Sequence, residues 1–280
     1  MQIGQPSRTA LGAASLRAAH QVLEHGAIFA DPLALRILGI SPDDIDRDAE
    51  AEVARLRLRY FIAMRARLAE EALAAAVARG VRQFIVLGAG LDTFAYRTTL
   101  GDHLRIFEVD HPDTQAWKRQ RLADAAIAVP DMLSFVPVDF ETESLSDKLA
   151  AAGFDPARRS FFSWLGVVPY LTETAIFATL AAIASLPGGA EVVFDYVNPS
   201  VSIDQAGTRL AHEALATRVA ALGEQLRNAF DSDALHARLK ALGFEHIDDA
   251  GPQQLAARFF PDRAASSPRN GAHVIRAATS

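Results

Sequence analysis

The chain has 280 residues, half of them hydrophobic, and a formal net charge of −6. This length suits one large α/β domain or one domain with a cap, and the apolar content allows a large core. The acidic balance disfavours a nucleic-acid partner, because neutralising phosphates requires a basic face. The chain contains no cysteine, which excludes disulfides, thiolate metal sites and a cysteine nucleophile.

The sequence carries no membrane signal. Residues 1–9 lack the apolar core of a signal peptide, and no run of about 18 apolar residues occurs. We therefore expect a soluble cytoplasmic protein without a membrane partner. The sequence gives no indication of the oligomeric state.

Residues 1–80 are predicted to be helical. Apolar residues recur at helical spacing over 9–23, and Asp31 followed by a proline is typical of a helix N-cap. The alanine-rich stretch 49–79 predicts one long helix that ends at a glycine. Most of its arginines are expected to form a solvated basic face.

Two arginines of this long helix differ from the others. Arg57 and Arg59 stand beside the aromatic pair Tyr60-Phe61. Guanidinium groups bind carboxylates in a forked geometry. We therefore treat Arg57 and Arg59 as candidates for holding a ligand carboxylate.

The central motif of the chain is a strand followed by a glycine turn. The apolar run Phe84 to Leu87 predicts a strand that is buried on both faces, and Gly88-Ala89-Gly90 follows it directly. Glycines permit a sharp turn and a close approach of a ligand to the main chain. A second strand ends at Asp110, twenty residues beyond Gly90. An acid in this place is suited to bind ribose hydroxyls, so the motif predicts a nucleoside site.

A dinucleotide dehydrogenase is the first alternative. Its fingerprint requires a third glycine or alanine, where this chain has Thr93. Asp92 also places a negative charge where a pyrophosphate would dock. S-adenosylmethionine, with a ribose, an amino group and no phosphate, fits better. A glycine turn that binds no nucleoside is the other alternative.

From residue 82 onward, strands and helices alternate. Strands are expected at 83–87, 104–109, 134–138, 160–165 and 191–197, and closing strands at 243–248 and 273–277. Helices are expected at 113–127, 172–186 and 231–241, with a further helical segment over 203–229. Asp139 and Phe140 follow the third strand and are suited to bind an adenine through its amino group and by stacking.

We divide the chain into an N-terminal helical cap, residues 1–80, and a cofactor-binding core, residues 81–280. A helical insertion at about 198–230 follows the fifth strand. Because it leaves the sheet at the predicted ligand edge, we expect this insertion to cover the acceptor substrate together with the N-terminal helices.

These motifs, in this order, resemble the leucine carboxyl methyltransferase family, and most closely its bacterial S-adenosylmethionine-dependent branch, which is often linked to secondary metabolism. The motifs are Thr9-Ala10, Phe29-Ala30-Asp31-Pro32, Arg57-Leu58-Arg59-Tyr60-Phe61, Leu87 to Thr93, Tyr96-Arg97, Glu108 to Pro112, Val138-Asp139-Phe140 and Trp164 to Val167 with Tyr170-Leu171. The resemblance covers nearly the whole chain. It implies a Rossmann-like class I α/β fold, whose seven-stranded sheet has its last strand antiparallel.

The resemblance also implies roles for individual residues. Arg57, or else Arg59, would hold the methionyl carboxylate, and Asp110 would hold the ribose. The other implied cofactor contacts are Gly88, Ala89, Gly90, Asp92, Asp139, Phe140 and Leu165. Leu165 stands where the carboxyl methyltransferases have a glutamate, and Phe94 stands where many relatives have an arginine.

The predicted reaction is methyl transfer from S-adenosylmethionine to a hydroxyl or carboxylate of a small molecule, with S-adenosylhomocysteine as the product. Displacement at the sulfonium methyl depends mainly on proximity and alignment. No dedicated base is evident, and His212 is the one histidine that we single out for testing. No metal or serine-hydrolase motif is present. A non-catalytic cofactor-binding protein and a protein carboxyl methyltransferase are the alternatives.

Overall fold

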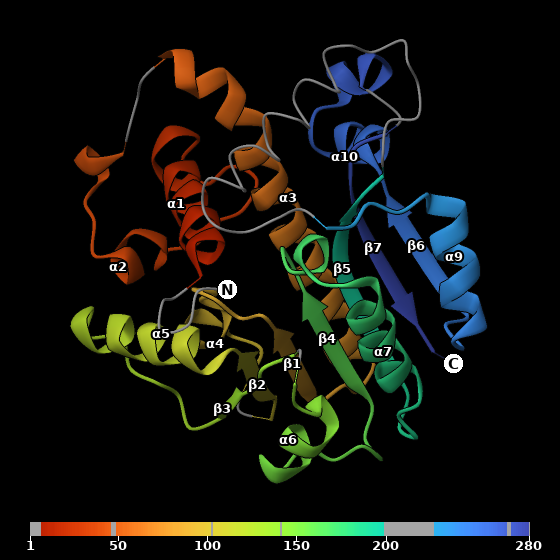
Figure 1. Ribbon diagram of the computed structural model, residues 1–280. Coiled ribbons are helices and arrows are strands. Elements are labelled where there is room, and N and C mark those ends of the chain that lie inside the picture. The colour runs from red at the N-terminus through yellow and green to blue at the C-terminus, as the bar shows by residue number, and fades with distance from the viewer. Residues whose placement is uncertain are drawn as a thin grey trace.

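The structure, a computed structural model, describes residues 7–45, 49–101, 103–140, 142–198, 227–267 and 270–279. These residues form a seven-stranded sheet with the order β3-β2-β1-β4-β5-β7-β6 (Figure 1). Helices cover both of its faces. Residues 203–226 of the predicted helical segment and the candidate base His212 lie outside the described residues, and residues 227–230, which end the predicted insertion, are not helical.

Six strands of the sheet point in the same direction, and β7 runs antiparallel to both of its neighbours, β5 and β6. The strands are β1 (Gln83–Leu87), β2 (Arg105–Asp110), β3 (Leu133–Pro137), β4 (Ser160–Trp164), β5 (Ala190–Val197), β6 (His246–Ala250) and β7 (Ala272–Ala278). This is the predicted fold, including the antiparallel last strand. Because β1 pairs with both β2 and β4, the order in which successive strands are added reverses at β1. In sheets of this kind, ligands bind beyond the carboxyl ends of the strands at such a point.

The helices that follow the strands form two layers. Helices α6 (Leu145–Ala151), α7 (Glu173–Ala184) and α9 (Ser232–Ala241) pack on one face of the sheet. Helices α3 (Ala49–Ala78), α4 (Phe94–Arg97) and α10 (Pro252–Phe259) pack on the other. In Figure 1, α3 passes behind the strands and α7 lies in front of them.

The central strands are buried on both faces, as their unbroken apolar runs predict. Every residue of β1 and β4 is buried, whereas the edge strand β6 is half-exposed. Parallel strands between two helical layers need apolar side chains on both sides. The core therefore consists of two clusters, one on each face of the sheet.

The N-terminal helices form a third cluster beside the sheet. Helices α1 (Arg8–Leu23) and α2 (Ala34–Leu38) pack against α5 (Pro112–Asp124), and the short 3-10 helix Pro42–Asp44 follows α2. Arg36 of α2 joins this group to the core by donating to the carbonyls of Ala125 and Ala126. The division into a helical cap, residues 1–80, and a cofactor-binding core, residues 81–280, stays a prediction.

Two predicted boundaries are wrong. Asp31 does not cap a helix directly, because α2 begins at Ala34 with Leu33 as its N-cap. The Asp31 side chain instead binds the Leu33 amide and partners outside the helix. The strand expected from Gly243 begins at His246, because Gly243 has φ +103° and closes the turn after α9.

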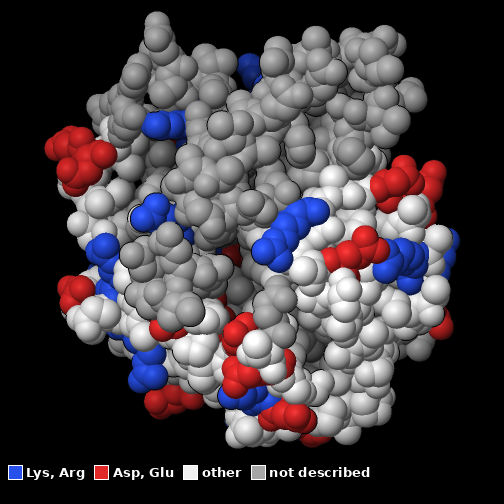
Figure 2. Space-filling view, viewed as in Figure 1, with Lys and Arg blue, Asp and Glu red and all other residues white. Residues whose placement is uncertain are grey.

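No helix within the described part of the chain is long and apolar enough to span a bilayer. On the face seen in Figure 2, acidic and basic side chains are intermixed over the described surface. That mixture agrees with the modest negative charge of the whole chain.

Candidate functional site

The glycine turn after β1 is tight and closely covered. Gly88 and Gly90 have φ of +65° and +47°, and the Ala89 amide donates to the Val109 carbonyl at the end of β2. A Cβ on Gly88 would lie 2.3 Å from Val167 Cγ2, and a Cβ on Gly90 would lie 3.0 Å from Ala10 Cβ. Both the left-handed backbone and the close neighbours therefore require glycine.

Asp110 binds this turn directly. Its Oδ2 accepts the Gly90 amide at 2.6 Å, and its Oδ1 accepts the His111 amide at 2.7 Å. Burial raises the pKa of Asp110, although the two amide donors oppose the change. Each carboxylate oxygen has a second lone pair, so the group can still accept bonds from a ligand.

Asp139 and Phe140 lie at the same edge, beyond β3. The Val138 amide donates to the Asp110 carbonyl at 2.9 Å, which brings the two predicted contact regions together. The Asp139 amide donates to Glu143 at 2.9 Å. The Phe140 ring is half-buried and packs against the core cluster on the α6–α7–α9 face.

Leu165 follows β4 and packs into the cluster on the α3 face. The next residue, Gly166, donates its amide to Asp195 Oδ1 at 2.5 Å. Arg65 of α3 binds the other oxygen of Asp195 at 2.8 Å. This pair fixes the loop that places Val167 over Gly88.

The two candidate arginines of α3 have different surroundings. Arg59 is buried, and its guanidinium binds both carboxylate oxygens of Glu24, the C-cap residue of α1. Arg57 is exposed. Arg57 precedes Arg65, the arginine that reaches Asp195, by eight residues, which is about 12 Å along the helix axis. Arg59 is thus bound by Glu24, which leaves Arg57 as the exposed candidate of the two.

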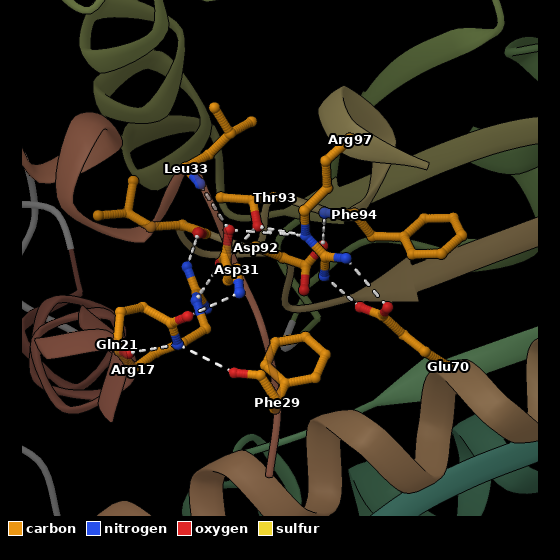
Figure 3. A network of polar contacts seen from close by, with 11 residues as sticks. Arg17, Gln21, Phe29, Asp31, Leu33, Glu70, Asp92, Thr93, Phe94 and Arg97 are labelled. Atoms are coloured by element: carbon orange, nitrogen blue, oxygen red, sulfur yellow. Dashed lines mark hydrogen bonds and ion pairs between the residues drawn. The ribbon is translucent and has the colours of Figure 1, made fainter. Parts of the chain in front are cut away.

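A charged network lies directly behind the turn (Figure 3). Asp31 is buried at its centre, where Arg17 Nε lies 2.7 Å from Oδ2 and Thr93 Oγ1 donates to the same oxygen at 2.7 Å. Arg97 Nε donates to Thr93 Oγ1 at 3.0 Å, and its terminal nitrogens bind Glu70 of α3. We call these five residues the Asp31 network.

The Asp31 network holds the residues on either side of Asp92. Arg17 Nη2 donates to the Leu91 carbonyl at 2.6 Å, and the Thr93 hydroxyl is bound as described. Asp92 itself is partly exposed, and its Oδ1 accepts the Phe94 amide at 2.8 Å. At the position where a dehydrogenase would have its third glycine, Thr93 thus joins Asp31 to Arg97 through its hydroxyl group.

A buried ion pair lies beneath Asp110, on the same face of β2. Lys118 Nζ lies 2.7 Å from Glu108 Oε2, and the Tyr96 hydroxyl donates to the same oxygen at 3.1 Å. Burial raises the pKa of Glu108 to about 7, with Lys118 opposing the change. Burial, reinforced by Glu108, also raises the pKa of Tyr96.

A second polar group lies at the opposite end of the same sheet edge. Asp249 accepts the Tyr196 hydroxyl at 2.6 Å and lies 2.8 Å from His236 Nε2 and 3.0 Å from His273 Nδ1. Ser232 Oγ lies 2.7 Å from the Tyr196 hydroxyl. We call these five residues the Asp249 cluster.

Sequence reasoning missed the Asp31 network, the Glu108–Lys118 pair and the Arg65–Asp195 pair. Asp31 was interpreted as a helix cap, and Thr93 only as a departure from glycine. A signal was present, because Asp31 and Arg97 carry opposite charges within two of the recognised motifs. The other two pairs join segments far apart in sequence, and no local pattern marks them.

Comparison with known proteins identifies the family. The family model "Leucine carboxyl methyltransferase" matches residues 10–184. The chain is 34% identical over 213 residues to YktD of Bacillus subtilis, named "Putative S-adenosyl-L-methionine-dependent methyltransferase"; the match covers 75% of this chain and 69% of YktD. A Streptomyces coelicolor protein classed by the same name is 36% identical over 188 residues, which is 64% of this chain and 65% of the relative.

The chain belongs to the leucine carboxyl methyltransferase family. A solved structure with a related fold, a DUF574 family protein from Streptomyces avermitilis, has a TM-score of 0.54 and 14% identity, over 95% of this chain and 97% of that one. The expected family, the class I fold and the cofactor S-adenosylmethionine are confirmed. The protein is thus an S-adenosylmethionine-dependent methyltransferase, and the roles of its single residues stay predictions.

Proposed function

We propose that this protein methylates an oxygen atom, hydroxyl or carboxylate, of a small-molecule acceptor, in keeping with a role in secondary metabolism. The observation that carries the proposal is the covered glycine turn. Ala10 of α1 lies against Gly90, and Val167 lies against Gly88. A site closed in this way by the chain's own helix and loop favours a small acceptor over a protein surface.

In the proposed site, Asp110 holds the ribose while it binds the turn through Gly90. Asp139 and Phe140 hold the adenine, and the turn with Asp92 borders the methionine part. Arg57 binds the methionyl carboxylate, which requires its exposed side chain to reach toward the sheet edge. Leu165 and Val167 supply an apolar wall.

An apolar wall suits this chemistry. The methyl group leaves a positively charged sulfur, so charge decreases in the transition state and a dry pocket carries no penalty. The protein's main contribution is then to align the acceptor oxygen with the sulfur–methyl bond. A carboxylate acceptor needs no general base, whereas a phenol or alcohol benefits from one.

The first test is a calorimetric titration of the purified protein with S-adenosylmethionine, with NAD as the parallel control. Binding of S-adenosylmethionine alone is expected. Purified protein is then incubated with labelled cofactor and panels of hydroxylated and carboxylated small molecules. Mild alkali releases methanol from methyl esters but not from ethers, so this treatment distinguishes the two acceptor types.

Two outcomes would overturn the proposal in different ways. Cofactor binding without turnover of any acceptor would favour the non-catalytic cofactor-binding alternative. Turnover confined to peptides with a free C-terminal carboxylate would favour protein carboxyl methylation.

Asp110→Ala should weaken S-adenosylmethionine binding by about 1–3 kcal/mol, the cost of losing hydrogen bonds to a charged group. Asp110→Asn should lose nearly as much, because its amide group would face either the Gly90 or the His111 amide. Calorimetry measures both losses. Asp113→Asn, at a partly exposed position in the first turn of α5, is the control. Unchanged affinity in the Asp110 variants would remove Asp110 from the site.

Arg57→Ala should weaken binding of S-adenosylmethionine more than binding of adenosine, which lacks the carboxylate. Arg67→Ala, an exposed arginine of the same helix, is the matched control. Competition titrations with both ligands measure the difference. Equal losses for the two ligands would mean that Arg57 does not hold the carboxylate.

A further inference from the structure

The residues behind the glycine turn are more constrained than a simple turn requires. Leu91, Asp92 and Thr93 follow Gly90 directly, and two arginines from different segments bind the residues that flank Asp92. Arg17 reaches the Leu91 carbonyl from α1, and Arg97 reaches the Thr93 hydroxyl from α4. Figure 3 shows the two guanidinium groups converging on Asp31.

Asp31 holds the two arginines in place. Its side chain is fully buried, and it faces Arg17 at 2.7 Å and Arg97 Nε at 3.6 Å. Both arginine side chains are 12% exposed. Carboxylate and guanidinium groups removed from water keep a fixed geometry, because any displacement leaves a charge unpaired.

Further contacts restrain Arg97. Its guanidinium lies over the Phe29 ring at 5.0 Å and binds Glu70 of α3 with both terminal nitrogens. Burial raises the pKa of the Glu70 carboxyl, and the neighbouring Arg97 only partly opposes that change. For Arg97, burial acts to lower the pKa, but the hydrogen bonds and charge of Glu70 outweigh it, so the pKa of Arg97 is raised. Side chains from α1, the 29–33 loop, α3 and α4 thus meet behind the three residues Leu91, Asp92 and Thr93.

We propose that Arg17, Asp31, Thr93 and Arg97 are positioning residues, which fix the glycine turn and Asp92 for the methionine part of the cofactor. Asp92 Oδ1 accepts the Phe94 amide, and in this proposal the partly exposed carboxylate also accepts a hydrogen bond from the cofactor's ammonium group. This inference rests on the proposed cofactor site and deepens it. Through Arg17 of α1 and Asp31 of the 29–33 loop, the N-terminal part of the chain then contributes to cofactor selectivity.

Thr93→Val and Thr93→Ser form the decisive pair. Valine has nearly the same shape as threonine but lacks the hydroxyl that joins Asp31 to Arg97, and serine keeps that hydroxyl. S-adenosylhomocysteine, which carries the amino-acid part, and adenosine, which lacks it, are titrated into each protein. Thr93→Val should lose about tenfold or more in affinity for S-adenosylhomocysteine, the effect of about 1.4 kcal/mol, and little for adenosine. Thr93→Ser should stay near the unmodified protein for both ligands.

A second pair tests the arginine contact. Arg17→Met removes the donor to the Leu91 carbonyl, and Arg17→Lys restores one donor and the charge. Arg36→Met is the matched control, because Arg36 also joins an N-terminal helix to main-chain carbonyls, at Ala125 and Ala126, away from the turn. The selective loss is expected in Arg17→Met, with recovery in Arg17→Lys and no loss in Arg36→Met.

The outcomes separate the hypotheses. Equal losses for both ligands would show a merely structural role and overturn the inference, as would unchanged S-adenosylhomocysteine affinity in Thr93→Val. If Arg17→Met does not fold, the Thr93 pair decides alone. Failure of the unmodified protein to bind S-adenosylhomocysteine would instead overturn the proposed cofactor site, and the inference with it.

Discussion

Two aspartates near the edge of the sheet where the parallel strands end, Asp31 and Asp249, each bind several polar side chains, and the kinds of partner differ. At the β1–β2 end, Asp31 is held by Arg17, Arg97 and a threonine hydroxyl. At the β5–β7–β6 end, Asp249 is held by a tyrosine hydroxyl and two histidines. Two partners of Asp31 carry a permanent charge, whereas the partners of Asp249 are a hydroxyl group and two imidazole groups.

This difference predicts how the stability of each region responds when a mutation removes one partner. Buried ions that lose a partner leave an uncompensated charge, which is costly. A neutral hydroxyl group that loses a partner costs less, because no ionic charge is left unpaired. The end that carries the glycine turn is therefore expected to be the stiffer one and the more sensitive to mutation.

The largest expected effect is from Arg97→Ala, which removes the counter-charge of Glu70 and Asp31. We expect a loss of about 3–5 kcal/mol in the free energy of unfolding, measured by urea denaturation. Arg67→Ala, which breaks the exposed pair with Glu71 on α3, should cost about 0–1 kcal/mol. Similar losses in the two variants would contradict the comparison.

The next effect concerns pH at the β1–β2 end. The pKa of Glu108, about 7 through burial, is above its ordinary value, so its contribution to stability is complete below about pH 4.5 and is lost as pH rises through 7. The unmodified protein should lose about 2–3 kcal/mol over this range. The Glu108→Gln, Lys118→Met double variant, which removes both charges, should lack that component. An identical pH dependence in both proteins would rule out Glu108 as its source.

The smallest expected effect on stability concerns Asp249, at the β5–β7–β6 end. Burial raises the pKa of Asp249, but hydrogen bonds from His273, Tyr196 and His236 outweigh it, and the pKa is lowered. Asp249→Asn should therefore cost about 1–2 kcal/mol at pH 7, and the cost should vanish as pH falls through the lowered pKa. Denaturation at several pH values measures this. A difference that persists undiminished in acid would contradict the assignment.

The sheet could be predicted because its signals are local. Residues 84–87 are apolar without interruption, Gly88 and Gly90 mark the turn, and Asp110 marks the end of the next strand. The predicted and observed bounds of β1 agree at both ends. The start of β6 was missed because Phe244 is apolar and buried like a strand residue, although it lies in the turn after α9.

The site was harder to predict because its polar partners come from distant segments. Asp31 and Thr93 are 62 residues apart, and Arg65 and Asp195 are 130 apart. Local patterns describe each residue by its neighbours, so Asp31 resembled a helix cap and Arg59 resembled a ligand contact. The burial of Arg59 against Glu24 depends on how α1 crosses α3, which no short motif encodes.

The place of β7 has a consequence for synthesis of the chain. This strand lies between β5 and β6, and β6 precedes it in the sequence. While the ribosome is still making β7, β6 has no neighbour in the sheet, and the open edge of β5 has no partner either. The parallel strands can assemble earlier, since domains build up from the N-terminal side. The nascent protein is thus expected to expose a strand edge until β7 inserts, and this interval is when a chaperone would be of most use.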